Sequence, residues 1–266
     1  MTIIDTHAHI YPDKIALRAV ASIGDFYDIP MGLDGTVDTL LKVGEEAGIS
    51  RHLVHSVALT WERVHSINDF IHASVEAHPD RFIGFGAMHP DHPEMDKELD
   101  RLMSFGFRGV KLHPDTQRFC LDDPAAIRLF EAMAERGLIL LCHMGDYRYP
   151  YSEPERMARA LDRVPELKMI GAHFGGWSIW RDAWKTLAGR ENVFVDSSSS
   201  LYALEPREAV DIIHRYGAEK VFFATDYPMW NPVEELARFH ALPLTEAERD
   251  MILHRNFERL IGEAPA

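Results

Sequence analysis

Short apolar runs rich in β-branched residues alternate with longer amphipathic stretches along the whole chain. Each run is four to seven residues long and is bounded by Gly, Pro, Asp or Ser, which is typical of strands that helices bury on both faces. The predicted strands are Thr2–Thr6, His52–Ala58, Phe82–Met88, Gly109–His113, Leu138–His143, Lys168–His173, Val193–Asp196 and Val221–Thr225.

The stretches between these runs carry apolar residues at three- and four-residue spacing, which predicts helices. Asp123-Pro124, Glu153-Pro154 and Glu205-Pro206 place a proline in a first helical turn. Eight strands alternating with eight helices in 266 residues predict an α/β fold, a single-domain (β/α)8 TIM barrel. A doubly wound open sheet is the alternative, because periodicity does not show closure. No Gly-x-Gly-x-x-Gly follows the first strand, which disfavours dinucleotide binding.

One irregular stretch interrupts this alternation. It runs over residues 10–35 and contains Pro12 and Pro30, with further Gly and Asp residues near its end. Because it follows the first strand, we expect an elaborated loop over the mouth of an active site. No linker or low-complexity run divides residues 1–266, so we expect one domain.

Composition narrows the class of protein. The formal net charge is −14, from 28 basic and 42 acidic side chains, which disfavours nucleic acid as a partner. The longest apolar run, Leu138–Cys142, is far too short to span a membrane, and the first ten residues do not resemble a signal peptide. Two cysteines make no disulfide framework, so we expect a cytoplasmic protein.

Histidine is abundant, and its positions are informative. Among fifteen histidines, His7 and His9 end the first strand, and His113, His143 and His173 end the fourth, fifth and sixth. Asp226 directly follows the eighth strand. Intervals of thirty residues separate the last three histidines, about one β/α unit, so we expect these side chains at the same end of the barrel, where TIM barrels build active sites.

A His-x-His pair on a strand places both imidazoles on one face. Two imidazoles directed at one point favour a metal ion, and a third imidazole with a carboxylate completes a set suited to zinc or a similar transition ion. A surface-facing strand end is the alternative for the His-x-His pair alone.

Five motifs resemble those of the amidohydrolase superfamily, in the same order along the chain. They are Asp5-Thr6-His7-Ala8-His9, Gly109-Val110-Lys111-Leu112-His113-Pro114, Cys142-His143-Met144-Gly145, Gly171-Ala172-His173-Phe174-Gly175-Gly176 and Ala224-Thr225-Asp226-Tyr227-Pro228. The nearest resemblance is to the amidohydrolase-related branch of TIM-barrel metal-dependent hydrolases. This branch includes decarboxylases similar to 2-amino-3-carboxymuconate-6-semialdehyde decarboxylase.

The resemblance implies one divalent metal ion, zinc in the first place and manganese as the alternative, with ligands His7, His9, His143 and Asp226. It also implies two catalytic residues. Asp226 would accept the proton of a metal-bound water. His173 would assist catalysis and, where the site holds one metal ion, would not coordinate it. The general chemistry agrees, because a bound zinc lowers the pKa of its water to about 7.

Other residues are candidates for binding the substrate. Lys111 is open to three interpretations: a carboxylated lysine bridging two metals, as in many superfamily members, a cation that binds a substrate carboxylate, or a lysine reaching into solvent. His113 shares a strand face with it. Arg148 is our preferred carboxylate anchor, because arginine offers bidentate geometry. Tyr11 and Trp177 complete a predicted aromatic wall for a small carboxylate substrate.

The remaining polar features are expected to be structural. His89 could line the pocket, although a structural role is favoured, and no function is assigned to His55. The run Ser197–Ser200 lacks a nucleophile elbow and is interpreted as a structural or substrate-contacting loop.

Three function classes compete. The first hypothesis is a metal-dependent hydrolase that attacks an amide, lactone or ester of a small organic acid with metal-activated water. The alternative is a non-oxidative decarboxylase of a ring or unsaturated carboxylic acid. A non-catalytic binding barrel is the third class. The apolar segment Met251–Leu260 could pack on its own barrel or on a neighbour, and a homodimer is the expected assembly.

Overall fold

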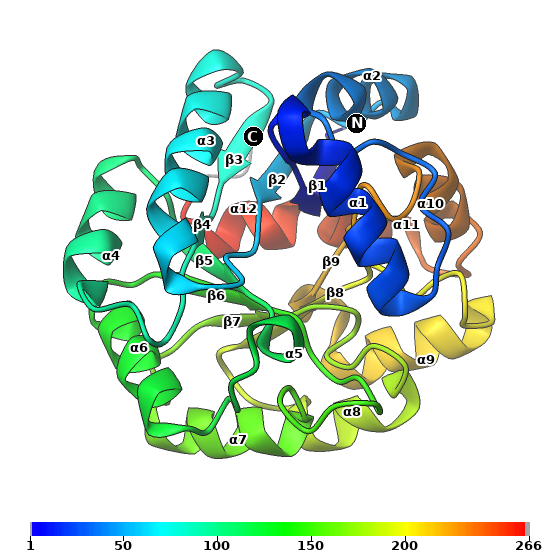
Figure 1. The fold of residues 1–266 in the computed structure, drawn as a ribbon. Coiled ribbons are helices and arrows are strands. Elements are labelled where there is room, and N and C mark those ends of the chain that lie inside the picture. Colours follow the sequence, from blue (N-terminus) through cyan, green and yellow to red (C-terminus); the bar gives the residue numbers. More distant parts are fainter. Residues whose placement is uncertain (1, 264–266) are drawn as a thin grey trace.

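Parallel strands form a closed ring in the computed structural model, which describes residues 2–263 (Figure 1). The strands are β1 (Ile4–His9), β2 (Arg51–His55), β3 (Phe82–Gly84), β4 (Gly86–Ala87), β5 (Gly109–Leu112), β6 (Ile139–Cys142), β7 (Met169–Gly171), β8 (Val193–Asp196) and β9 (Val221–Phe222). They pair in sequence order, β1 to β3 and β4 to β9. Only Phe85 separates β3 from β4, so together they make the predicted third strand.

Backbone hydrogen bonds between the first strand and the residues around the end of the last one close the ring. The Thr6 amide donates to the Phe223 carbonyl at 3.0 Å, and the Asp226 amide donates to the His7 carbonyl at 2.9 Å. The closed barrel is therefore confirmed, and the alternative of an open doubly wound sheet is wrong.

Helices surround the strands on the outside or cover the ends of the barrel (Figure 1). They are α1 (Asp13–Tyr27), α2 (Val37–Ala47), α3 (Val64–Ala77), α4 (Met95–Ser104), α5 (Pro114–Gln117), α6 (Pro124–Glu135), α7 (Pro154–Arg163), α8 (Trp180–Leu187), α9 (Pro206–Tyr216), α10 (Pro232–His240), α11 (Glu246–Asp250) and α12 (Asn256–Leu260), with short helical turns η1 (Trp61–Arg63), η2 (Ala218–Lys220) and η3 (Met251–Arg255). The prolines predicted at helix starts lie at the first positions of α6, α7 and α9.

The segment 10–35 differs from the prediction. Instead of an irregular loop it contains α1, a helix of fifteen residues. Its periodicity is weak because α1 buries only the small side chains of Ala16 and Val20, while Leu17 is 73% exposed. The segment does lie by the strand ends, since the Tyr27 hydroxyl at the C-terminal end of α1 contacts the strand-end residue His113.

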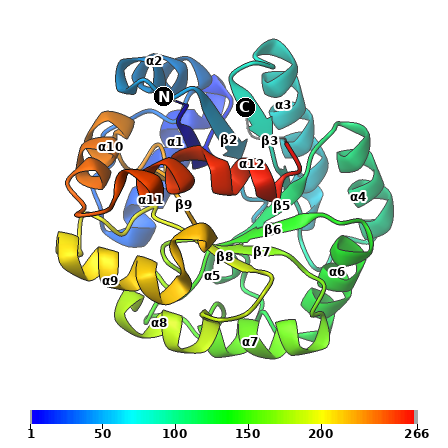
Figure 2. The same ribbon diagram turned by 180° about the vertical axis from the view of Figure 1, so that it is seen from behind.

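Two apolar layers hold the barrel together. Ile139 and Leu141 of β6 point into the barrel with Phe222, whereas Leu140 and Cys142 pack outward against the helices. The far end of the barrel is closed by α12, which crosses in front of the strands in the view of Figure 2. Phe257 of this helix packs edge-on against Phe222, with ring centroids 5.6 Å apart.

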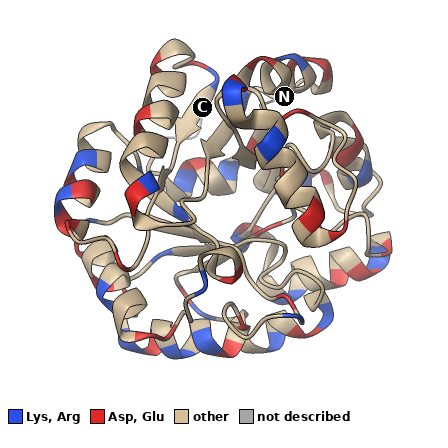
Figure 3. Ribbon diagram, viewed as in Figure 1, with Lys and Arg blue, Asp and Glu red and all other residues tan. Residues whose placement is uncertain are grey.

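Charged residues lie mainly along the outer helices, with both signs interspersed (Figure 3). None of the helices within residues 2–263 combines the length and the apolar character that a membrane crossing requires.

Candidate active site

A bulge in β1 directs two histidines into the barrel. The pairing register with β2 shifts between Asp5 and Ala8, so Ile4 faces the barrel interior while Ala8 joins the outer apolar layer. Such a bulge re-aims the side chains that follow it. As a result, the Nε2 atoms of His7 and His9 approach to 3.2 Å, on one face as predicted.

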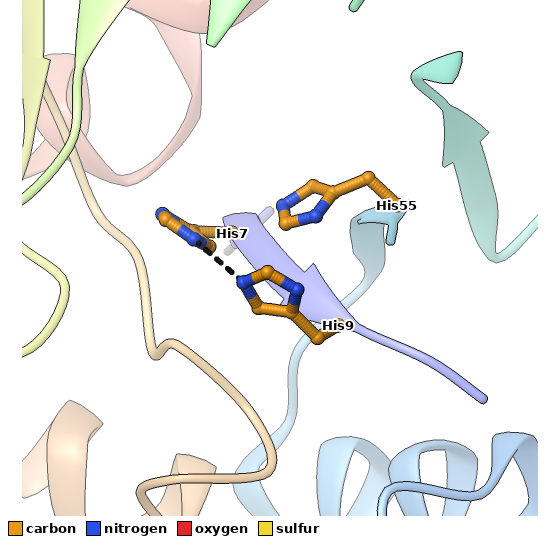
Figure 4. Close-up of side chains that lie close together, drawn as sticks. All are labelled: His7, His9 and His55. Atoms are coloured by element: carbon orange, nitrogen blue, oxygen red, sulfur yellow. Dashed lines mark hydrogen bonds between the residues drawn. The ribbon is translucent and has the colours of Figure 1, made fainter. Parts of the chain in front are cut away.

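His55, at the end of β2, completes a group of three imidazoles (Figure 4). Its ring lies edge-on to His9 and His7, with centroids 4.4 Å and 4.9 Å away. Both of its ring nitrogens are buried and have no hydrogen-bond partner within residues 2–263. The sequence analysis missed His55 because the predicted strand extended to Ala58, which placed this histidine mid-strand. Had the predicted strand ended at His55, its position at a strand end would have marked it as a candidate site residue.

Asp226 brings a carboxylate to this group. Its Oδ1 lies 3.4 Å from His7 Nε2 and 3.6 Å from His9 Nε2. The buried Asp5 positions the segment, because it accepts hydrogen bonds from the Thr225 amide at 2.9 Å and from the Thr225 hydroxyl at 2.7 Å. The predicted proximity of His7, His9 and Asp226 is present in the structure.

Two partners determine which ring nitrogen of His7 carries the proton. Asp196 Oδ2 lies 2.9 Å from His7 Nδ1, and a buried carboxylate requires that nitrogen to carry the proton. The lone pair is therefore on Nε2, where Lys111 Nζ donates at 3.0 Å. Lys111 is 1% exposed, so the interpretation of a lysine reaching into solvent is wrong. No sequence signal marked Asp196 beyond its position at the end of β8.

His173 is held in a similar way. Its Nδ1 lies 3.0 Å from the Ser198 carbonyl, which accepts its proton, so Nε2 carries the lone pair. That lone pair faces His143 Nδ1 at 3.0 Å. Ser198 also places its hydroxyl 3.1 Å from His7 Nδ1, which links the two histidines.

His143 lies with a second buried group, formed with His113 and Asp115. The rings of His113 and His143 stack with centroids 3.9 Å apart, and the Tyr27 hydroxyl lies 2.7 Å from His113 Nε2. Among the predicted metal ligands, His7, His9 and Asp226 thus lie together, while His143 is next to them on the far side of His173.

Burial sets the charge of the site. Burial, and to a lesser extent the charge of the nearby Lys111, lowers the pKa of His9 to about 3. Burial likewise lowers the pKa values of His7, His55, His143 and His173. The pKa of Lys111 falls to about 8 for the same reason, although the Asp226 and Asp196 carboxylates oppose the shift. The imidazoles are therefore neutral at pH 7, the form that binds metals.

Arg148 is not the free carboxylate anchor that the sequence suggested. Its Nε and Nη2 donate to Asp146 at 2.9 Å and 2.7 Å, and its Nη1 donates to the Phe26 carbonyl at 2.7 Å. Because these bonds use an N–H of each of its three nitrogens, Arg148 fastens α1 to the loop after β6. The Asp146-x-Arg148 spacing was the available signal.

The predicted aromatic wall is only partly assembled. Trp177 is buried and packs edge-on against Tyr27, with ring centroids 4.9 Å apart. Tyr11 lies nearly parallel to His9, but its ring centroid is 6.5 Å away. Tyr27, which was not predicted because it lies in α1, thus joins the wall.

The donor set fits a divalent metal. His7, His9 and His55 are neutral, their nitrogens lie close together, and several of them lack partners within the described chain. Adding one carboxylate oxygen from Asp226 gives the nitrogen-rich chemistry that transition ions prefer.

Comparison with a family model decides the classification. The model described as Amidohydrolase matches residues 4–262. The chain belongs to this amidohydrolase family. The resemblance inferred from the five motifs is therefore confirmed, as is the barrel fold.

Two characterised relatives of this amidohydrolase are decarboxylases. Gamma-resorcylate decarboxylase of a Polaromonas species is 25% identical over 254 residues, covering 75% of this chain and 76% of the relative. The 2-amino-3-carboxymuconate-6-semialdehyde decarboxylase of Dictyostelium discoideum is 26% identical over 245 residues, covering 75% of this chain and 66% of the relative.

A solved structure supports the fold. The dihydroxybenzoic acid decarboxylase of Polaromonas, with bound manganese and the inhibitor 2-nitroresorcinol, superposes with a TM-score of 0.75 at 20% identity. The superposition covers 98% of this chain and 97% of the other.

Proposed function

We propose that this amidohydrolase is a metal-dependent, non-oxidative decarboxylase of a small ring or unsaturated carboxylic acid. The observation that carries the proposal is that both curated relatives, each aligned with 75% of the chain, are decarboxylases. The site supports it, because a buried cation and neutral imidazoles suit an anionic substrate. The hydrolase reading, our first hypothesis from sequence, becomes the second candidate.

The metal would be held by His7, His9 and Asp226, with His55 and His143 as the further nitrogen donors nearby. Once bound, it would orient the substrate and stabilise the negative charge that develops as the carbon–carbon bond breaks. Manganese is proposed first, because it is bound in the related decarboxylase, and zinc is the alternative from the donor chemistry.

The chain's own residues would manage charge and protons. Lys111, buried beside His7, supplies the cation that attracts the carboxylate. In the reaction the bond to the carboxyl carbon breaks, carbon dioxide leaves, and the electron pair remaining on the substrate carbon takes up one proton. Asp226 would take up this proton from solvent and then deliver it to the substrate carbon, and His173, fixed by the Ser198 carbonyl, would assist it.

Hydrolysis is the second candidate because Asp226 lies close to both His7 and His9. A carboxylate in that place could accept a proton from an attacking water. In that case a lactone, ester or amide would be cleaved without release of carbon dioxide.

A direct comparison of products tests the choice. We would supply purified, manganese-loaded protein with a panel of aromatic and enoic carboxylic acids and, in parallel, with lactones, esters and amides. We expect carbon dioxide release from at least one acid, and at least a 100-fold loss of it in Asp226→Asn. Hydrolysis without carbon dioxide release would reject the decarboxylase in favour of the second candidate.

A further inference from the structure

A chain of hydrogen bonds reaches the oxygen of Asp226 that does not face His7 and His9. Trp230 Nε1 donates to the Ser199 hydroxyl at 2.8 Å, and the Ser199 hydroxyl in turn donates to Asp226 Oδ2. Ser199 is 1% exposed. These residues come from the loops that follow β8 and β9, and the mechanism proposed above uses neither Ser199 nor Trp230.

The direction of this chain follows from the chemistry of its members. An indole nitrogen can only donate, so the serine oxygen must accept from Trp230. The single hydroxyl proton of Ser199 then points at the carboxylate. Met229 Sδ also lies 3.4 Å from the same oxygen, but a thioether is a weak acceptor beside a carboxylate.

This chain of hydrogen bonds gives the two oxygens of Asp226 different partners. Oδ2 accepts from Ser199, which leaves Oδ1 directed at His7 and His9. The indole itself is held in place, because Trp230 stacks on Tyr202 with ring centroids 4.4 Å apart. The carboxylate is therefore fixed by contacts outside the imidazole group.

We infer that Ser199 and Trp230 are positioning residues that act in series, Trp230 through Ser199, to present Asp226 Oδ1 to the metal and substrate. The inference rests on the proposed function only in giving Asp226 its role. Ser199 needs its hydroxyl and Trp230 needs its indole N–H. Ser199→Ala and Ser199→Gly both remove the hydroxyl, and Gly also suits the left-handed backbone of this residue, where φ is 45°. Trp230→Phe removes the indole N–H while keeping an aromatic ring.

Metal affinity provides the first test. We would titrate metal-free protein with Mn²⁺ by calorimetry, for the wild type, S199A, S199G, W230F and the S199A/W230F double variant. S199A should weaken binding about 10- to 100-fold, as expected when the partner of a metal-binding residue is removed. S199G should weaken it to the same extent, because it also lacks the hydroxyl but does not strain the left-handed backbone. W230F should weaken binding several-fold alone but add nothing in the S199A background, because the two act in series. Thermal unfolding would confirm that each variant is folded.

The Trp230 indole signal provides a readout that needs neither metal nor substrate. In ¹⁵N-labelled protein this N–H resonance, assigned by its loss in W230F, should shift and exchange faster with solvent in S199A, and should shift in D226N. Three results would each contradict the inference. The first is an unchanged Mn²⁺ affinity in S199A, and the second is additive losses of affinity in the double variant. The third is an indole resonance that changes in neither S199A nor D226N. Failure of the wild type to release carbon dioxide would reject the proposed reaction and leave these comparisons standing.

Discussion

At the scale of single residues, carboxylates decide which nitrogen of a histidine can bind. Asp196 accepts from His7 Nδ1 through Oδ2, while its Oδ1 accepts from the His173 amide at 3.0 Å and from the Ser198 amide at 3.0 Å. One oxygen therefore organises the loop, and the other fixes the tautomer of His7.

Asp196→Asn should reverse that tautomer. The amide oxygen would continue to accept from the two backbone amides, which leaves the NH2 group facing His7 Nδ1. His7 would then carry its proton on Nε2, and we expect Mn²⁺ affinity to fall about 10- to 100-fold. Calorimetry would measure the affinity, and ¹⁵N shifts of the imidazole would report the tautomer. Asp162→Asn, an exposed partner of Arg190, is the matched control. Wild-type affinity in D196N would contradict this reading.

At the scale of elements, α1 covers the site and Arg148 attaches it. The guanidinium lies 5.0 Å from the Phe26 ring centroid and 5.5 Å from that of Tyr27, in addition to its bond with the Phe26 carbonyl. His7, Lys111 and His143 are each at most 1% exposed beneath this part of the chain. We therefore expect the end of α1 to move when a substrate enters.

Arg148→Ala should release that end. We expect hydrogen exchange over residues 20–28 to accelerate at least 10-fold, because the variant loses a charge-assisted bond worth roughly 1.5–3 kcal/mol. Exchange in α6 should not change. Arg18→Ala, an exposed arginine on the same helix, should behave like the wild type. Equal protection of α1 in R148A and the wild type would show that other contacts hold the helix.

Elements with a strong apolar pattern could be predicted from the sequence, whereas those fixed by tertiary contacts could not. The barrel strands were found because helices bury both of their faces. The helix α1 was missed because it buries only Ala16 and Val20 and exposes Leu17.

The same distinction applies to the site. His7, His9 and Asp226 could be brought together from strand ends alone, because every strand of the barrel runs in the same direction. Asp196 and Ser199 could not, because their roles depend on contacts with residues up to 189 positions away in the sequence. Arg148 was placed at the correct end of the barrel, but its pairing with Asp146 depends on the conformation of the loop.

At the scale of the whole molecule, stability depends on charges that folding removes from water. Glu235 of α10 is 0% exposed, and its Oε2 has no hydrogen-bond partner among residues 2–263. Burial raises the pKa of Glu235 from 4.5 to about 7, although Arg238 opposes the shift. The folded protein therefore holds this proton where the unfolded chain releases it, so its contribution to stability falls as the pH rises from 4.5 to 7.

Glu235→Gln should remove this loss of stability with rising pH, because glutamine does not titrate. Relative to the wild type, the variant should gain up to about 3 kcal/mol of unfolding free energy between pH 5 and pH 8, because the pKa of Glu235 is 4.5 in the unfolded chain and about 7 in the folded protein. Urea unfolding at both pH values would measure it. The quantity to compare is the difference in unfolding free energy between E235Q and the wild type, because the buried histidines also titrate and change the stability of both proteins. Glu234→Gln changes the exposed neighbouring residue and should show the same pH dependence of stability as the wild type. If E235Q also showed that pH dependence, the raised pKa of Glu235 would be contradicted.

His173 and Asp226 both adopt left-handed backbone conformations, with φ of 61° and 60°. Side chains other than Gly, Asn, Asp and His rarely accept that region, which costs most residues about 1–3 kcal/mol. In a library of all substitutions at these two positions, the folded survivors should therefore be dominated by Asn and Gly. Loss of activity in an alanine variant would mix strain with missing chemistry. Asn suits the left-handed backbone at both positions, so Asp226→Asn removes only the charge of the carboxylate and His173→Asn removes only the imidazole. The local geometry thus selects which mutants can be interpreted.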